Sequence, residues 1–97
     1  MDKCCKIGFV GSGNMASAIA NGLLEKQLYS PKEIIASNRS KDRLKAFKER
    51  FGVLIAENNQ ELVQKAQTII IAVKPQQFLA VAKELKPFLD KNQLVIS

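Results

Sequence analysis

The sequence predicts an α/β fold of one domain, in which helices cover both faces of a parallel β-sheet. Short apolar segments alternate with helix-periodic segments and short loops along the whole chain, a pattern typical of parallel sheets with right-handed crossovers. Within the apolar segments, polar and apolar residues do not alternate, as expected for strands buried on both faces. The first segment runs directly into Gly11-Ser12-Gly13 and then into a helical pattern. Together these observations predict a Rossmann-like, doubly wound sheet.

The first strand is expected over Cys5–Val10, and it leads into the pattern G-x-G-x-x-A. Gly11 allows a tight turn, Gly13 lets a pyrophosphate approach the backbone, and Ala16 is small enough for close helix–strand packing. Backbone N–H groups at the start of the next helix would face the anion. Because glycine pairs are also common in ordinary turns, a dinucleotide-binding crevice has to be supported by the rest of the chain.

The first helix is expected from Asn14 to about Lys26. Its apolar face is predicted from three residues at intervals of four: Met15, Ile19 and Leu23. Ser30-Pro31-Lys32-Glu33 then has the form of a capping box with proline at the first helical position, which predicts one short turn of helix. The second strand follows over Ile34–Ser37.

The polar residues after the second strand favour NADP over NAD. Enzymes that choose NAD place an acidic residue here to bind the adenosine ribose, but no carboxylate occurs before Asp42. The guanidinium of Arg39 can bind a 2′-phosphate with two hydrogen bonds, whereas a carboxylate would repel it. The neighbours that could add donors are Ser37, Asn38 and Ser40. A polar loop with Ser40 as the N-cap of the next helix is an alternative, and it is compatible with phosphate binding.

The remaining elements follow from apolar periodicity and from helix start and stop signals. Gly52 and Pro87 are expected to end helices, whereas Asn58 and Pro75 are expected to start them. The fourth strand is β-branched and apolar throughout, which predicts a central position. The expected elements are a helix over Lys41–Phe51, a strand over Val53–Ala56, a helix from Asn58, a strand over Thr68–Val73, a helix from Pro75 and an exposed edge strand over Leu94–Ser97.

The first and fourth strands should be neighbours at the point where the strand order reverses. Their carboxyl ends, Gly11–Gly13 and Ala72–Lys74, would then flank one crevice. Lys74 would lie beside the phosphates or the nicotinamide half of a cofactor, although a charged residue that merely ends a strand is an equal alternative. No residue here is a convincing acid, base or nucleophile, so we predict no catalytic residue.

Composition excludes several function classes. The 97 residues are 46% apolar and 25% charged, which suits one globular domain. No apolar run approaches the roughly 20 residues that span a bilayer, and no signal-peptide pattern is present, so we expect a cytoplasmic protein. The net charge is +6, but the lysines are dispersed and lack interleaved aromatic residues. This favours a solvated surface over a nucleic-acid or membrane partner.

The two cysteines, Cys4 and Cys5, are adjacent and lack the spacing of a redox or zinc site. There is no histidine to complete a metal shell, so no metal is expected. Neighbouring residues on a strand point to opposite faces. We therefore expect no bridge between the two, and two small, reduced core residues.

Three stretches resemble pyrroline-5-carboxylate reductase: Lys6–Ala16, Ala72–Pro75 and Leu94–Ser97. The resemblance covers the whole chain and keeps the order and spacing of the family's motifs. It implies a pyrophosphate-binding turn, an adenosine 2′-phosphate site, a cofactor-contacting asparagine and a segment beside the cofactor. The residues implied are, in that order, Val10, Gly11, Ser12, Gly13, Asn14 and Met15; Asn38, Arg39 and Ser40; Asn59; and Ala72, Val73, Lys74 and Pro75. On sequence alone, an asparagine such as Asn59 at a strand–helix junction is also typical of a helix cap.

The resemblance also implies an activity, the reduction of 1-pyrroline-5-carboxylate to L-proline with NADPH, with NADH possible. Family members carry a helical domain that makes the dimer and binds substrate, and it would follow Ser97. Residues 1–97 are therefore expected to be the dinucleotide-binding domain of a longer, homo-oligomeric enzyme, inactive alone. The alternatives are a related small oxidoreductase, such as a deazaflavin-dependent NADP reductase, and a non-catalytic dinucleotide-binding module.

Overall fold

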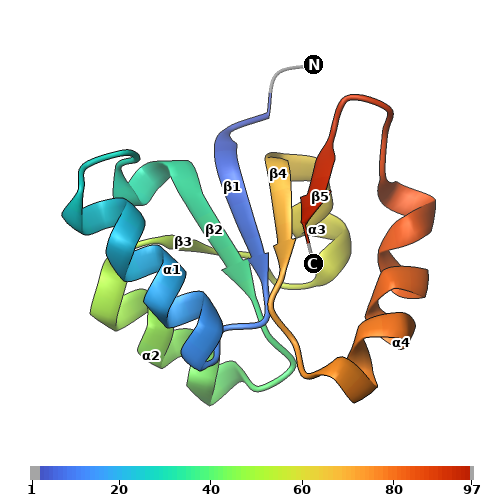
Figure 1. Cartoon of the computed structure of the whole chain (residues 1–97), viewed down its shortest axis with the longest axis horizontal. Coiled ribbons are helices and arrows are strands. Elements are labelled where there is room, and N and C mark those ends of the chain that lie inside the picture. Colours follow the sequence, from blue (N-terminus) through green and yellow to red (C-terminus); the bar gives the residue numbers. More distant parts are fainter. Residues whose placement is uncertain (1–2, 97) are drawn as a thin grey trace.

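The computed structural model describes residues 3–96 and contains one sheet with helices on both faces (Figure 1). The strands are β1 (Cys5–Val10), β2 (Ile34–Ser37), β3 (Leu54–Ile55), β4 (Ala66–Ile71) and β5 (Leu94–Ile96). The α-helices are α1 (Asn14–Glu25), α2 (Lys41–Phe51), α3 (Asn59–Lys65) and α4 (Pro75–Leu85), and the 3-10 turns are η1 (Pro31–Glu33) and η2 (Lys86–Phe88). The expectations for Met1, Asp2 and Ser97 lie outside the described residues.

All strand pairs are parallel, and their order is β3-β2-β1-β4-β5. The central strand β1 pairs with β2 on one side (Ile7 opposite Ile34) and with β4 on the other (Ile7 opposite Thr68). The predicted doubly wound α/β fold is therefore confirmed, and so is the predicted contact between the first and fourth strands. The order reverses between β1 and β4, which places the switch point of the sheet there.

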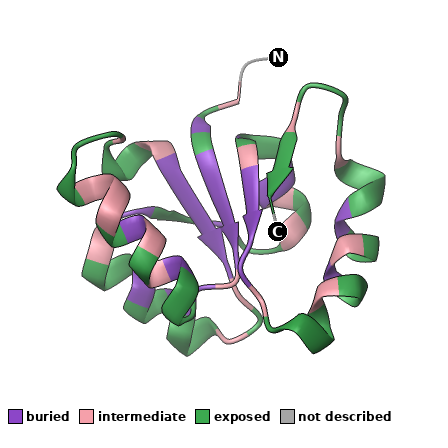
Figure 2. Ribbon diagram, viewed as in Figure 1, coloured by how far each residue is buried: buried purple, intermediate pink, exposed green. Residues whose placement is uncertain are grey.

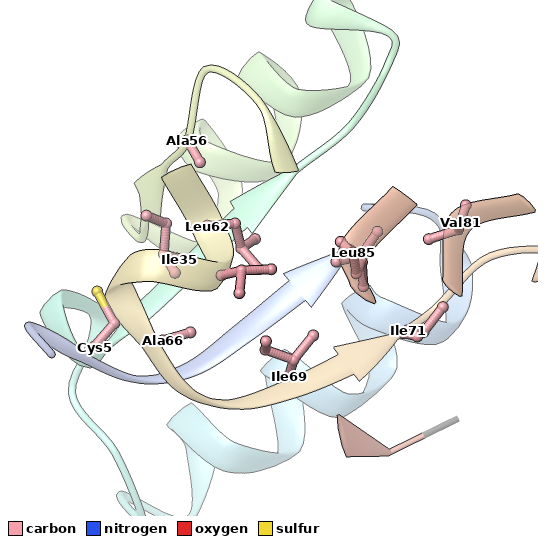
Figure 3. Close-up of a cluster of buried hydrophobic side chains, with 11 residues drawn as sticks. Cys5, Ile35, Ala56, Leu62, Ala66, Ile69, Ile71, Val81 and Leu85 are labelled. Atoms are coloured by element: carbon pink, nitrogen blue, oxygen red, sulfur yellow. The ribbon is translucent and has the colours of Figure 1, made fainter. Parts of the chain in front are cut away.

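Two apolar layers hold the helices to the sheet. On one face, α1 and α2 cover β1 and β2, where Phe9 packs edge to face against Phe47 with ring centroids 6.1 Å apart. On the other face, α3 and α4 cover β1 and β4 through a cluster that includes Leu62, Ile69 and Leu85 (Figure 3). The three inner strands β1, β2 and β4 are largely buried, whereas the edge strands β3 and β5 are exposed (Figure 2). The burial of the inner strands explains why their sequences do not alternate polar with apolar residues.

Gly8 in β1 lies against Leu62 of α3 and Ala66, the first residue of β4. A Cβ atom at this position would lie 2.7 Å from the Cβ of Ala66 and 2.9 Å from Cδ2 of Leu62. We therefore expect Gly8→Ala to lower the free energy of unfolding by about 1–3 kcal/mol through overpacking, measured as a shift of the urea midpoint. The double variant Gly8→Ala/Ala66→Gly removes the opposing methyl group. It should recover part of the loss, and equal destabilisation in both variants would contradict this explanation.

Most predicted helix ends are confirmed. The Glu33 carboxylate accepts a hydrogen bond from the Ser30 N–H at 2.9 Å, which closes the capping box. That bond and the neighbouring Lys6 hold the pKa of Glu33 below its ordinary value. The Asn58 side chain caps α3 by accepting from the Glu61 N–H at 2.8 Å. Gly52 ends α2 with φ at 71°, a conformation that glycine adopts without strain.

The structure corrects the bounds of two strands. β3 keeps only the central two of the four residues expected, because it is an edge strand that pairs with β2 at Leu54 and Ile55 alone. The expected strand Thr68–Val73 instead begins at Ala66, which pairs with Cys5. It leaves the ladder after Ile71, and the Ala72 N–H makes the last bond to the Val10 carbonyl at 2.8 Å.

The expected apolar face of α1 is partly wrong. Met15 is 51% exposed, whereas the fully buried residues are Ala16 and Ala20. Ile19 and Leu23 pack against the core only at its margin. The helix lies so close to the sheet that small side chains fill the interface, and Met15 is left at the helix start.

The expectation for the cysteines is also partly wrong. Cys5 is a buried core residue, but Cys4 is exposed. Cys4 precedes β1, so the alternation of a strand does not apply to it. The two sulfur atoms do not point apart and lie 3.1 Å from each other.

Candidate dinucleotide-binding site

The strands β1 and β4 lead into α1 and α4, which lie on opposite faces of the sheet (Figure 1). A crevice opens at this carboxyl edge of the sheet. The structure brings most of the predicted site residues together around it. The predicted residues that line the crevice are Val10, Gly11, Ser12, Gly13, Ser37, Asn38, Arg39, Asn59, Ala72, Val73 and Lys74. They come from the carboxyl ends of β1, β2 and β4 and from the start of α3, and the parallel sheet places these segments at one edge.

The glycine turn is held between β2 and β4. The Gly11 N–H donates to the Ser37 carbonyl at 2.9 Å, and the φ of Gly11 is 101°. A Cβ atom on Gly11 would lie 2.4 Å from the Ala72 carbonyl oxygen, whereas one on Gly13 would meet nothing within 4 Å. Gly11 is thus required by the fold, and Gly13 leaves free space above its backbone.

The N-terminus of α1 has the features of an anion site. Its N-cap residue is Gly13. Among the described residues, no side chain makes a capping hydrogen bond to this helix end, and the first turn contains no acidic residue. The first N–H groups of a helix lack intrahelical partners and carry the positive end of the helix dipole. Beside the open space at Gly13, these groups can donate hydrogen bonds to a phosphate.

Two hydrogen-bonded groups order the polar side of the crevice. The Asn38 amide nitrogen donates to the Ser12 hydroxyl at 2.6 Å, and its amide oxygen accepts from the Ser40 N–H at 2.9 Å. Asn38 therefore ties the glycine turn to the loop after β2. In the second group, the buried Ser37 hydroxyl donates to the Asn59 amide oxygen. The Asn59 amide nitrogen donates to the Glu84 carboxylate at 2.9 Å.

The charge of the crevice is positive. Its cationic lining residues are Arg39, Arg43 and Lys74, and no carboxylate lines it among residues 3–96. The carboxylate of Glu84 contacts the site through Asn59. A crevice of this charge, with backbone N–H donors at its floor, suits a polyanionic ligand.

Four predicted site residues do not line the crevice. Asn14 and Met15 form the first turn of α1, and Pro75 begins α4. The Ser40 hydroxyl caps α2 by accepting from the Arg43 N–H at 3.3 Å, which is the alternative role considered for it.

Sequence reasoning missed three lining residues, Arg43, Gln77 and Val81. Arg43 and Gln77 lie in the first turns of α2 and α4, and Val81 follows one turn later. A usable signal existed, because the first turn of a helix that follows a parallel strand lies at the carboxyl edge of the sheet.

The described residues contain no group of three or more histidine, cysteine, aspartate or glutamate side chains that could hold a metal ion. Over the same residues, 3–96, no helix is both long and apolar enough to cross a membrane.

The comparisons with known proteins agree with this geometry. Residues 6–97 match the model of a family described as NADP oxidoreductase, coenzyme F420-dependent. The chain is 40% identical over 92 residues to the pyrroline-5-carboxylate reductase of Escherichia coli (strain K12). The matched region covers 95% of this chain and 34% of that relative. This similarity confirms the resemblance that the motifs predicted.

Two solved structures are similar to the whole domain. A pyrroline-5-carboxylate reductase from Coxiella burnetii has a TM-score of 0.81 and 39% identity, over 92% of this chain and 33% of that one. The pyrroline carboxylate reductase of Plasmodium falciparum, crystallised with NADP bound, has a TM-score of 0.78 and 26% identity, over 98% of this chain and 33% of that one. The chain thus spans about a third of the length of the curated relatives it matches.

Proposed function

Because the chain belongs to the family of coenzyme F420-dependent NADP oxidoreductases, we propose that it is the NADP-binding domain of a pyrroline-5-carboxylate reductase. The whole enzyme would reduce 1-pyrroline-5-carboxylate to L-proline with NADPH. The observation that carries this proposal is the positively charged crevice at the switch point, built around Gly11 and Gly13. The relatives at 40% identity favour this reaction within the family.

The residues present fit NADP. The open space above Gly13 and the uncapped N-terminus of α1 suit the pyrophosphate. Asn14 and Met15 would contribute backbone N–H groups there, since their side chains lie outside the crevice lining. The guanidinium groups of Arg39 and Arg43 suit the adenosine 2′-phosphate.

The remaining side of the crevice would hold the sugar and nicotinamide parts of the cofactor. Ser37 offers a hydroxyl at the end of β2, and Asn59 offers an amide at the start of α3. The segment from Ala72 to Pro75 would run beside the cofactor, and Lys74 would be its positively charged side chain. NADPH supplies the hydride when bound, and this domain orients it and excludes water from one side.

The domain is proposed to act as part of a longer enzyme. Residues 1–97 would form the dinucleotide-binding domain, and the substrate-binding and dimer-forming groups would come from the part of the relatives' length that this chain does not span. The enzyme would be a cytoplasmic homo-oligomer that acts on a small cyclic imine, without nucleic acid or membrane partners. The family description also supports a second candidate, an NADP reductase that uses a deazaflavin.

Calorimetric titration of the chain with NADPH and NADH tests the cofactor assignment, and NADPH should bind more tightly. Turnover is tested with the full-length enzyme, which should reduce 1-pyrroline-5-carboxylate with NADPH, whereas the 97-residue chain should not. Reduction of NADP by a reduced deazaflavin, without proline formation, would instead support the second candidate. Failure of the chain to bind either nucleotide would refute both.

Glu84 is expected to act on cofactor binding by orienting Asn59. Its carboxylate fixes the amide through the 2.9 Å hydrogen bond, so Glu84→Ala should weaken NADPH binding about 3- to 10-fold, the value of one such bond. If Glu84 acted only as a negative charge near a polyanion, its removal would tighten binding instead. Titration calorimetry distinguishes these signs.

Two variants serve as controls for this prediction. Glu84→Gln keeps an acceptor for the Asn59 amide and should retain the affinity for NADPH. Glu49→Ala removes the same charge from an exposed position on α2, outside the crevice lining, and should leave the affinity unchanged.

A further inference from the structure

Cys5 is the first residue of β1 and Cys4 precedes it, whereas the crevice lies at the carboxyl end of that strand. Cys5 is labelled in Figure 3. The Sγ atoms of Cys4 and Cys5 are 3.1 Å apart. Cys4 is exposed and Cys5 is buried. Residues 1–97 contain 2 cysteines, so within them no other thiol competes for either sulfur.

The two thiols are chemically unequal. Burial, followed by the hydrogen bond and charge of Cys4, raises the pKa of the Cys5 thiol to about 12. Cys5 therefore stays protonated near neutral pH. The ammonium group of Lys65 acts in the opposite direction on the Cys5 thiol and lowers its pKa. Because the thiolate is the nucleophile and needs access to its target, the exposed Cys4 makes the first attack.

We propose that Cys4 and Cys5 form a redox-active vicinal dithiol that exchanges with small-molecule disulfides. In the first step the Cys4 thiolate attacks one sulfur of the small disulfide, a Cys4–sulfur bond forms, and the other sulfur leaves as a thiolate. In the second step the thiolate released in the first step takes the Cys5 proton. The Cys5 sulfur then attacks Cys4 Sγ, a Cys5–Cys4 sulfur bond forms, and the bound small thiol leaves as a thiolate. The dithiol is oxidised by two electrons, and the small disulfide is reduced to a thiol and a thiolate.

The geometry makes this closure feasible and reversible. A disulfide has a sulfur–sulfur distance of about 2.05 Å, so the two sulfurs need to approach by about 1 Å. Neighbouring Cα atoms across a trans peptide are about 3.8 Å apart, which is less than the roughly 4.4–6.8 Å usual for disulfides. The closed ring is therefore strained, and strained disulfides are the more easily reduced ones. The pair suits reversible exchange rather than a permanent structural link.

The test incubates the reduced 97-residue chain with oxidised glutathione and follows free thiols and intact mass. Both thiols should disappear, the mass should fall by two hydrogen atoms, and dithiothreitol should restore both values. On a non-reducing gel the chain should remain a monomer. Persistence of both thiols, a stable mixed disulfide or a disulfide-linked dimer would overturn the proposal.

Two variants assign the steps. Cys5→Ala should stop at a mixed disulfide on Cys4, and circular dichroism checks that this core substitution leaves the chain folded. Cys4→Ser leaves the core intact and should stay unmodified, because Cys5 is buried. Phenylarsine oxide, a reagent for paired thiols, gives a second measurement. The wild-type chain should retain one arsenic and Cys4→Ser none, and retention by Cys4→Ser would refute the pairing. The outcome does not depend on NADPH binding.

Discussion

Replacing Gly11 with alanine is expected to lower the free energy of unfolding by about 3 kcal/mol and to eliminate measurable NADPH binding. The backbone at Gly11 has a φ of 101°, which costs a residue with a Cβ atom about 1–3 kcal/mol. The added Cβ would also lie 2.4 Å from the Ala72 carbonyl oxygen. That contact is with the backbone of the strand end beside the turn, so relief requires the crevice itself to change. Urea unfolding and calorimetry measure the two effects.

Gly13→Ala is the matched control for this prediction. A Cβ at Gly13 would meet no atom within 4 Å, and its φ of −86° is accessible to alanine. The unfolding free energy should therefore change by less than about 1 kcal/mol. NADPH affinity should still fall about 10-fold or more, because the methyl group would occupy the space proposed for the pyrophosphate. A Gly13→Ala variant that binds NADPH normally would contradict the proposed position of the pyrophosphate.

Arg39→Ala is expected to weaken NADPH binding about 10- to 100-fold and to leave NADH binding unchanged. The exposed guanidinium of Arg39 lines the crevice at the end of β2. Charge-assisted hydrogen bonds to a phosphate contribute about 1.5–3 kcal/mol, and NADH has no 2′-phosphate to lose them. Parallel titrations of both nucleotides measure the difference, and it should shrink as salt screens the charge.

Lys48→Ala controls for the general loss of positive charge. Lys48 is exposed on α2 and does not line the crevice, so this variant should bind both nucleotides as the wild type does. Arg43→Ala should resemble Arg39→Ala, with a loss for NADPH alone. Equal weakening of NADPH and NADH by Arg39→Ala would refute the assignment of Arg39 to the 2′-phosphate.

Local sequence signals predicted most of the fold because they act within a few residues. The capping box at Ser30 and Glu33, the Asn58 cap and the left-handed Gly52 each depend on their own turn of chain. Strand bounds depended on distant partners instead. The start of β4 at Ala66 is determined by its pairing with Cys5, which lies 61 positions earlier in the chain, and no local pattern encodes that register.

The residues of the candidate site likewise fall into those that the local sequence predicts and those that depend on tertiary packing. The glycine turn and the basic loop after β2 could be predicted because their chemistry is written in consecutive residues. The roles of these residues in binding NADP stay predictions, whereas their convergence on one crevice is observed. Arg43 and Gln77 were missed although their places in the first turns of α2 and α4 offered a signal. Glu84 was not predicted, because it reaches the site from the last turn of α4, and the rotation of that helix relative to the sheet is determined by packing.

The sequence by itself determined the order of strands and helices, the family resemblance and the turn at Gly11 that joins β1 to α1. These follow from local conformational preference and from motifs of adjacent residues. Only the tertiary structure decided that the Ala72 carbonyl lies against Gly11 and that Asn59 is hydrogen-bonded to both Ser37 and Glu84. It also decided that the sulfur atoms of two adjacent cysteines are in contact. Those contacts join segments through the packing of the sheet and its helices, or arise where the chain bends before β1. The spacing of residues along the chain predicts neither the packing nor the bend.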